Sequence, residues 1–90
     1  MKFEWDQAKA AANLRKHNVS FEEAMTAFKD ALCATARDLE HSAAERRFIT
    51  FGLSAHGRLL TVSHTDRGSR VRIISARLIT RAERKIYEEG

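Results

Sequence analysis

Lys16, His17 and Arg77 carry side chains suited to cleaving a phosphodiester bond in RNA. The nucleophile of that reaction, the ribose 2′-hydroxyl, is already part of the substrate. A protein therefore needs a base for the hydroxyl proton, an acid for the 5′ leaving oxygen and cations around the phosphate. Lys16 or His17 could transfer a proton, and the planar guanidinium of Arg77 could hold two phosphate oxygens. Such a site needs no metal ion.

Four further residues are candidates for binding RNA around that site. Arg58 and Arg72 lie on predicted strands near hairpin ends, where a guanidinium could contact a phosphate. Tyr87, on a predicted helix, could stack on a base, although a tyrosine in such a place often packs against a sheet instead. His64 shares a predicted strand face with apolar residues, which is also typical of a half-buried, hydrogen-bonded histidine.

The catalytic candidates have structural interpretations as well. Lys16 and His17 fall at the end of a predicted helix, where the helix dipole favours positive charge. Arg77 could form an ion pair with Glu22 or Glu23 instead of holding a phosphate. The sequence leaves the catalytic and the structural interpretation of these residues open.

Other chemistries have little support in the sequence. The histidines are scattered, Cys33 has no second cysteine beside it, and no H-E-x-x-H motif is present, so a metal site is not expected. The four glycines form neither a G-x-G-x-x-G nor a Walker pattern, and no nucleophile-elbow motif occurs. We therefore expect neither a metal nor an organic cofactor.

Two consecutive helices are predicted near the N-terminus, over residues 6–17 and 21–29. Asp6 suits the N-cap of the first helix, which is rich in alanine and lysine. Ser20 and Glu23 form an S-x-x-E capping box that opens the second helix. The end of the first helix, with its two catalytic candidates, therefore lies at a tight corner.

The rest of the chain alternates with the period of strands. A short strand is expected over residues 2–5, and a meander follows the helices, with strands near residues 31–36, 47–53, 58–65 and 70–77. A second capping box, T-x-x-E from Thr80, opens a terminal helix. The predicted fold is α+β: a strand, two helices, an antiparallel meander of three or four strands, and a C-terminal helix. Without a linker or repeat, residues 1–90 are expected to form a single domain.

Positive charge is concentrated in the second half of the chain. The net charge is +4, yet residues 58–85 hold eight lysines and arginines against two acidic residues. Such a segment favours a polyanion or an acidic protein as partner, although a solvated face would look the same. The N-terminus lacks the apolar core of a signal peptide, and no apolar run could span a membrane. We expect a cytoplasmic protein that does not bind membranes.

Longer motifs make the chain similar to a known family. The opening WDQAKAAANLRKHNVSFEEA and the segments EHSAAERRF, GRLLTVSHT and RVRIISARLITRAERKIYEE resemble, in the same order, the BrnT family of toxins. The similarity extends over essentially the whole chain. The K-H-x-V-S-F-E-E-A and R-I-I-S-A-R segments are its most specific parts. The residues that match the family pattern are Trp5, Asp6, Lys16, His17, Ser20, Phe21, Glu22, His41, Ser42, Arg58, His64, Arg77 and Glu83.

This resemblance implies a compact RelE-like fold and an RNA-cleaving toxin of a type II toxin–antitoxin system. It also implies a small antitoxin with a ribbon-helix-helix DNA-binding part, so that the toxin would meet operator DNA only indirectly. Asn18 stands where the family often has glycine, and it tolerates the same backbone conformation. Ala44 replaces an acidic residue of the family at a position expected on the surface.

Two non-catalytic functions are alternatives to a ribonuclease toxin. The basic segment would equally serve a module that binds nucleic acid without cutting it, or a protein that only docks an acidic partner. Cleavage of RNA by the purified protein in EDTA would favour the ribonuclease. Co-purification with a partner, without RNA degradation, would favour docking.

Overall fold

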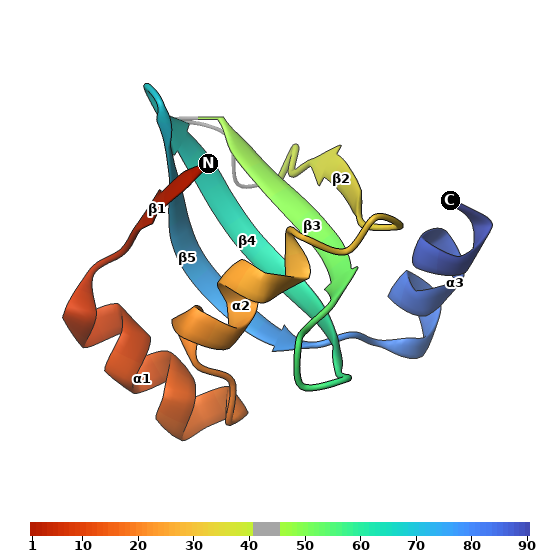
Figure 1. Ribbon diagram of the computed structural model, residues 1–90, viewed down its shortest axis with the longest axis horizontal. Coiled ribbons are helices and arrows are strands. Elements are labelled where there is room, and N and C mark those ends of the chain that lie inside the picture. The colour runs from red at the N-terminus through yellow and green to blue at the C-terminus, as the bar shows by residue number, and fades with distance from the viewer. Residues whose placement is uncertain (41–45) are drawn as a thin grey trace.

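The computed structural model describes residues 1–40 and 46–90, so that His41, Ser42, Ala44 and the neighbouring Glu45 of the sequence analysis lie outside the described residues. Strands and helices follow one another in the predicted order (Figure 1). They are β1 (Lys2–Glu4), α1 (Gln7–His17), α2 (Phe21–Ala27), β2 (Ala34–Arg37), β3 (Arg47–Leu53), β4 (Leu59–Arg67), β5 (Arg70–Leu78) and α3 (Arg81–Glu89). The α+β class, the paired N-terminal helices and the C-terminal helix are confirmed.

All the strands belong to a mixed sheet with the order β1-β5-β4-β3-β2. The meander from β2 to β5 is antiparallel throughout, as predicted. The short β1 lies beside β5 and runs parallel to it, pairing Phe3 with Val71. The sequence predicts β1 as a strand but does not indicate its partner, because three residues cannot encode a pairing direction.

The helix ends follow from their capping residues. The Asp6 side chain accepts hydrogen bonds from the first turn of α1, and Asn18 ends the helix in the left-handed conformation at φ 56°. Ser20 caps α2 by accepting from the Glu23 amide. The Thr80 capping box at α3 has both of its hydrogen bonds. All three predicted helix starts are therefore confirmed.

Two predicted boundaries shift for a common reason, the turn at Asp30. The Asp30 carboxylate accepts from the amide of Leu32, and its carbonyl accepts from Cys33. Residues 28–33 are therefore folded into turns. As a result α2 ends at Ala27 rather than at residue 29, and β2 begins at Ala34 rather than at residue 31.

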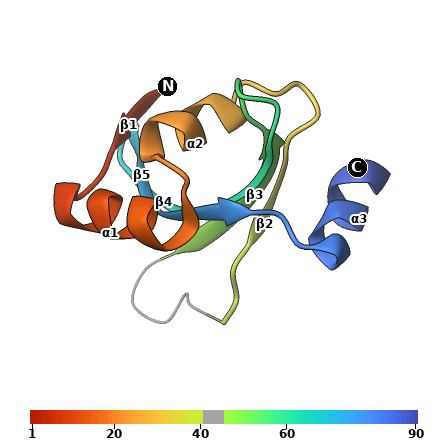
Figure 2. The same cartoon turned by 90° about the horizontal axis from the view of Figure 1, so that it is seen from below.

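The core lies between the sheet and the first two helices. Figure 2 shows α1 and α2 on one side of the sheet, with α3 set apart beside β2 and β3. Core side chains from α2 and its approach, Val19 and Phe21, meet Leu60, Val62 and Ile73 of the sheet. Because neighbouring residues of a strand face opposite ways, the alternate positions lie on the other face. No helix in the described residues is both long and apolar enough for a membrane span.

Candidate functional site

Arginines gather on the face of the sheet that points away from α1 and α2. We call this the outer face, and the strand register assigns to it Arg47, Arg67, Arg70, Arg72 and Arg77. The inner face, by contrast, carries the buried apolar residues of β4 and β5. Because side chains alternate between the two faces along each strand, the basic segment of the sequence forms a basic surface, which favours an anionic ligand.

Arg77 lies near the end of β5, where α3 begins. Its Nη1 and Nη2 atoms donate to the two carboxylate oxygens of Glu83, each at 2.8 Å. Glu83 also accepts from the Thr61 hydroxyl at 2.9 Å and from the Thr80 amide at 3.0 Å. These contacts lower the pKa of Glu83 to about 2, mainly through Arg77, and raise that of Arg77. Arg77 therefore forms an ion pair, but with Glu83 and not with Glu22 or Glu23, so the predicted partner is wrong.

The end of α1 is attached to the edge of β5 by Asn13. The Asn13 amide nitrogen donates to the carbonyls of Val19 and Ala76, at 2.9 and 2.8 Å, and its oxygen accepts from the Ala76 amide at 3.1 Å. Lys16 and His17 form the next turn of the helix, with Lys16 exposed and His17 partly exposed. Asn13 thus places both residues near the end of β5 that carries Arg77.

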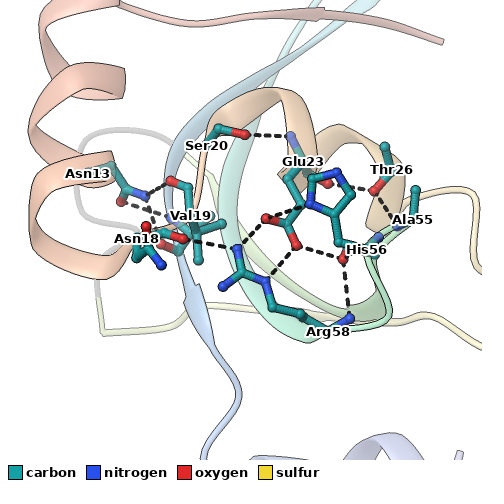
Figure 3. A network of polar contacts seen from close by, with 11 residues as sticks. Asn13, Asn18, Val19, Ser20, Glu23, Thr26, Ala55, His56 and Arg58 are labelled. Atoms are coloured by element: carbon teal, nitrogen blue, oxygen red, sulfur yellow. Dashed lines mark hydrogen bonds and ion pairs between the residues drawn. The ribbon is translucent and has the colours of Figure 1, made fainter.

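Arg58, just before β4, is held by a buried acid (Figure 3). Its Nε donates to Glu23 Oε2 at 2.9 Å, and its Nη2 contacts the other carboxylate oxygen. The Ser54 hydroxyl donates to the same carboxylate at 2.7 Å. Only 2% of the Glu23 side chain is exposed, and the hydrogen bonds from Arg58 and Ser54 lower its pKa despite this burial. The carboxylate therefore stays ionised.

Arg58 also joins the end of α1. Its Nη2 donates to the carbonyl of Asn18 at 2.9 Å, directly after His17 in the chain. Because β4 begins where β5 ends, Arg58 and Arg77 share one end of the sheet. We call the group Lys16, His17, Arg58 and Arg77 the basic end.

A cleft of about 390 Å³ opens at the basic end, between the sheet and α3. Its lining combines leucine and isoleucine side chains with two cations, Arg58 and Arg84. An apolar floor beside guanidinium groups suits a nucleotide, whose base is flat and apolar and whose phosphate is anionic.

The basic end does not bring Arg77 and α1 into direct contact. Arg77 lies on the outer face, whereas Arg58 and α1 belong to the inner side of the sheet. Within the described residues no hydrogen bond or ion pair joins Arg77 to Lys16 or His17. The structure therefore places the three predicted catalytic residues at one end of the sheet, but on two sides of it.

Arg72 and His64 are remote from the basic end. Arg72 donates to Glu4 of β1 at 2.8 Å on the outer face, toward the other end of β5. His64 is 5% exposed, and its Nε2 lies 2.8 Å from the Thr50 hydroxyl. It packs between Phe28 and Phe48, and burial lowers its pKa. His64 is thus a buried, hydrogen-bonded histidine in this structure, and a role for it in RNA binding stays a prediction.

Tyr87 anchors α3 to the turn after α2. Its hydroxyl donates to Asp30 Oδ2 at 2.7 Å, and the same oxygen accepts from the Leu53 amide. The hydrogen bond to Asp30 raises the pKa of Tyr87. The ring remains partly exposed beside the hollow between α3 and β2, which Ala31 and Cys33 also line. Stacking on a base stays a prediction for this residue.

Comparison with known proteins decides the family. Residues 5–83 match the family described as "Ribonuclease toxin, BrnT, of type II toxin-antitoxin system". The chain belongs to the BrnT family. Its fold is similar to the crystal structure of the Brucella abortus ribonuclease toxin BrnT, with 24% identity and a TM-score of 0.67, covering 90% of this chain and 99% of that one. A comparison with curated proteins finds no match.

Three residues of this BrnT-family chain were not among the sequence-based candidates, namely Asn13, Glu23 and His56. The sequence suggests Glu23 as a helix-capping residue and as a possible partner of Arg77, whereas in the structure it binds Arg58. The burial of Glu23 has no clear signal in the sequence, because Glu23 lies off the stripe formed by Phe21, Ala24, Met25 and Phe28. The roles of Asn13 and His56 likewise depend on contacts between distant elements.

No group of three or more histidine, cysteine or acidic side chains comes together as a metal ion would require in the part of the chain that the structure describes. What the BrnT-family chain does offer is cations, an ionised carboxylate and partly exposed titratable side chains at one end of a sheet. These groups can neutralise a phosphate and transfer protons.

Proposed function

We propose that this BrnT-family protein is a metal-independent endoribonuclease, the toxin of a toxin–antitoxin pair. The observation that carries the proposal is the basic end, where Arg58 lines a cleft with an apolar floor and where Arg77 and the last turn of α1 lie at the same end of the sheet. The RNA backbone would follow the arginines of the outer face and end in this cleft.

Arg77 would hold the phosphate at which the RNA is cut. Its two terminal nitrogens already bind two carboxylate oxygens, a geometry that two phosphate oxygens can reproduce. A bound phosphate would therefore compete with Glu83 for the same guanidinium. The pentacoordinate transition state carries more charge than the substrate and would bind Arg77 more strongly.

Lys16 or His17 would take part in proton transfer. One group accepts the 2′-hydroxyl proton as that oxygen attacks the phosphorus, and a second protonates the 5′ oxygen as the P–O5′ bond breaks. The products are a 2′,3′-cyclic phosphate and a free 5′-hydroxyl. The cations around the phosphate replace the metal ion that other nucleases use.

The proposed partner is a cognate ribbon-helix-helix antitoxin that covers much of the outer face. An acidic segment of the antitoxin would neutralise the arginines there and exclude RNA at the same time. Operator DNA would be bound by the antitoxin, and the toxin would contribute only through the complex.

The test measures RNA cleavage in EDTA by the parent protein and by Arg77→Ala and His17→Ala, each first shown to be folded by circular dichroism. Loss of the arginine should lower the rate at least about 10²-fold, and loss of a proton-transfer group about 10²- to 10⁴-fold. Arg15→Ala removes an exposed charge from the same helix as His17 and should leave the rate unchanged.

Three results would contradict the proposal. Loss of parent activity in EDTA would refute metal independence. Parent rates in both Arg77→Ala and His17→Ala would move the site elsewhere. RNA binding without any cleavage by the parent protein would favour the non-catalytic binding module.

A further inference from the structure

The β3–β4 turn holds a histidine against the buried carboxylate of the basic end. The His56 Nδ1 atom lies 3.5 Å from Glu23 Oε1, and the His56 amide donates to the Ser54 hydroxyl at 3.2 Å (Figure 3). The His56 side chain is nevertheless 68% exposed. One ring nitrogen thus faces an ionised carboxylate while most of the imidazole faces solvent.

Glu23 is well suited to orient this ring. Its carboxylate is fixed by Arg58 and Ser54, and its side chain is almost completely buried. A fixed carboxylate next to one imidazole nitrogen favours the tautomer with the proton on that nitrogen, which leaves the other nitrogen able to accept a proton. Nε2 is then the basic atom, on the solvent side.

Arg58 connects His56 to the end of α1. The guanidinium contacts Glu23 on one side and the Asn18 carbonyl on the other. His56 thus lies beside Glu23, one partner of Arg58, and His17 precedes Asn18, the other partner, in the chain. A phosphate at the basic end that also contacts Arg58 would lie close to His56 and to the last turn of α1.

We propose that His56 is a catalytic residue of the RNA cleavage, positioned by Glu23, and that it accepts the proton of the ribose 2′-hydroxyl. This inference rests on the proposed ribonuclease function and adds the base that the reaction needs. It also gives the Glu23 side chain a role as a positioning residue, while the Glu23 amide donates to Ser20 at the start of α2.

The proton balance of the step is complete with these residues. Neutral His56 accepts the 2′-hydroxyl proton at Nε2 while the 2′ oxygen forms a bond to phosphorus. The P–O5′ bond breaks, and the 5′ oxygen takes a proton from protonated Lys16 or His17. His56 then carries the extra proton, and exchange with water returns both groups to their starting states.

The experiment compares the parent protein, His56→Ala and His56→Gln on a single-stranded RNA oligonucleotide in EDTA, from pH 5 to 9. Both variants should lose about 10²- to 10⁴-fold in rate, and the limb of the parent pH profile that reports a neutral base should disappear. Added imidazole should restore part of the rate of His56→Ala but not of Arg58→Ala. Arg15→Ala should keep the parent profile.

The outcomes separate the two proposals. Cleavage by the parent protein together with an unchanged rate and pH profile in His56→Ala overturns the role of His56 and leaves the ribonuclease function standing. A slow His56→Ala that imidazole does not rescue and that keeps the parent pH profile also overturns it, since such a change is structural. Absence of cleavage by the parent protein overturns both.

Discussion

At the scale of single residues, Asn13 shows how one buried amide can decide the shape of the site. It satisfies the Val19 carbonyl and both backbone groups of Ala76, which have no strand beside them because β1 ends at Glu4. The last turn of α1, and with it Lys16 and His17, is aligned on the end of β5 by this single side chain.

Asn13→Ala should therefore lower the free energy of unfolding by roughly 2–4 kcal/mol, because it leaves several buried backbone groups without partners. Urea unfolding followed by circular dichroism measures this change. Lys9→Ala on the exposed side of the same helix is the control and should change stability by less than about 0.5 kcal/mol. Equal effects in the two variants would show that Asn13 does not hold the helix to the strand.

A second prediction at this scale concerns pH. The pKa of Glu83 is about 2 in the folded protein, against a usual value of 4.5. Because the folded pKa is the lower one, the ion pair with Arg77 contributes fully above about pH 5 and is lost as the pH falls toward 2. The stability difference between the parent protein and Glu83→Gln should be on the order of 2 kcal/mol at pH 6 and shrink steadily toward pH 3. A difference independent of pH in urea unfolding would contradict this.

At the scale of elements, the spacing between α2 and β3 depends on a glycine. A Cβ atom on Gly52 would lie 2.5 Å from the carbonyl oxygen of Ala27, the last residue of α2. Only a residue without a side chain lets the helix lie this close to the strand. The same packing fixes Glu23, one turn earlier, beside the β3–β4 turn.

Gly52→Ala should lower the free energy of unfolding by about 1–3 kcal/mol, since the helix has to move away from the sheet. Gly57→Asn is the matched control: Gly57 has a φ of 77°, which asparagine tolerates, and nothing lies within 4 Å of an added Cβ there. Differential scanning calorimetry should show a lower melting temperature for Gly52→Ala only. A Gly52→Ala protein as stable as the parent would mean that α2 adapts freely.

The elements that the sequence predicts well are those with local causes. Asp6, Ser20 and Thr80 cap their helices through contacts within three residues, and the β3 bounds follow from alternation. Less local features were missed: the parallel pairing of β1 depends on β5, far along the chain. The sequence names the residues of the basic end as candidates but does not indicate their partners. The pairing of Arg77 with Glu83, for example, depends on how α3 folds back toward the sheet.

At the scale of the whole molecule, the two faces of the sheet differ in composition. The inner face packs α1 and α2 to form the core, while the outer face presents arginines balanced by few acids, chiefly Glu4 and Glu83. This separation lets an anionic partner bind without disturbing the core. An association with the proposed antitoxin at this face would depend on electrostatic attraction.

Reversing two charges at once, Arg72→Glu with Arg81→Glu, should slow association with the antitoxin about tenfold or more at low salt. The difference from the parent should narrow as salt rises, because screening removes the long-range attraction. Stopped-flow measurements at several ionic strengths test this. Unchanged association rates would argue that the antitoxin binds away from the outer face, and Lys29→Ala, exposed beside α2, serves as the control.

The parallel pairing of β1 with β5 has a consequence for how the protein folds during its synthesis on the ribosome. The strand made first, Lys2–Glu4, finds its place only when Arg70–Arg72 have been made. At the usual speed of translation, 5–20 residues per second, that wait is roughly 3 to 14 seconds. Until then β1 has no strand to pair with. The proposed site at the end of β5 therefore cannot assemble before Arg77 has been synthesised and β5 has joined the sheet.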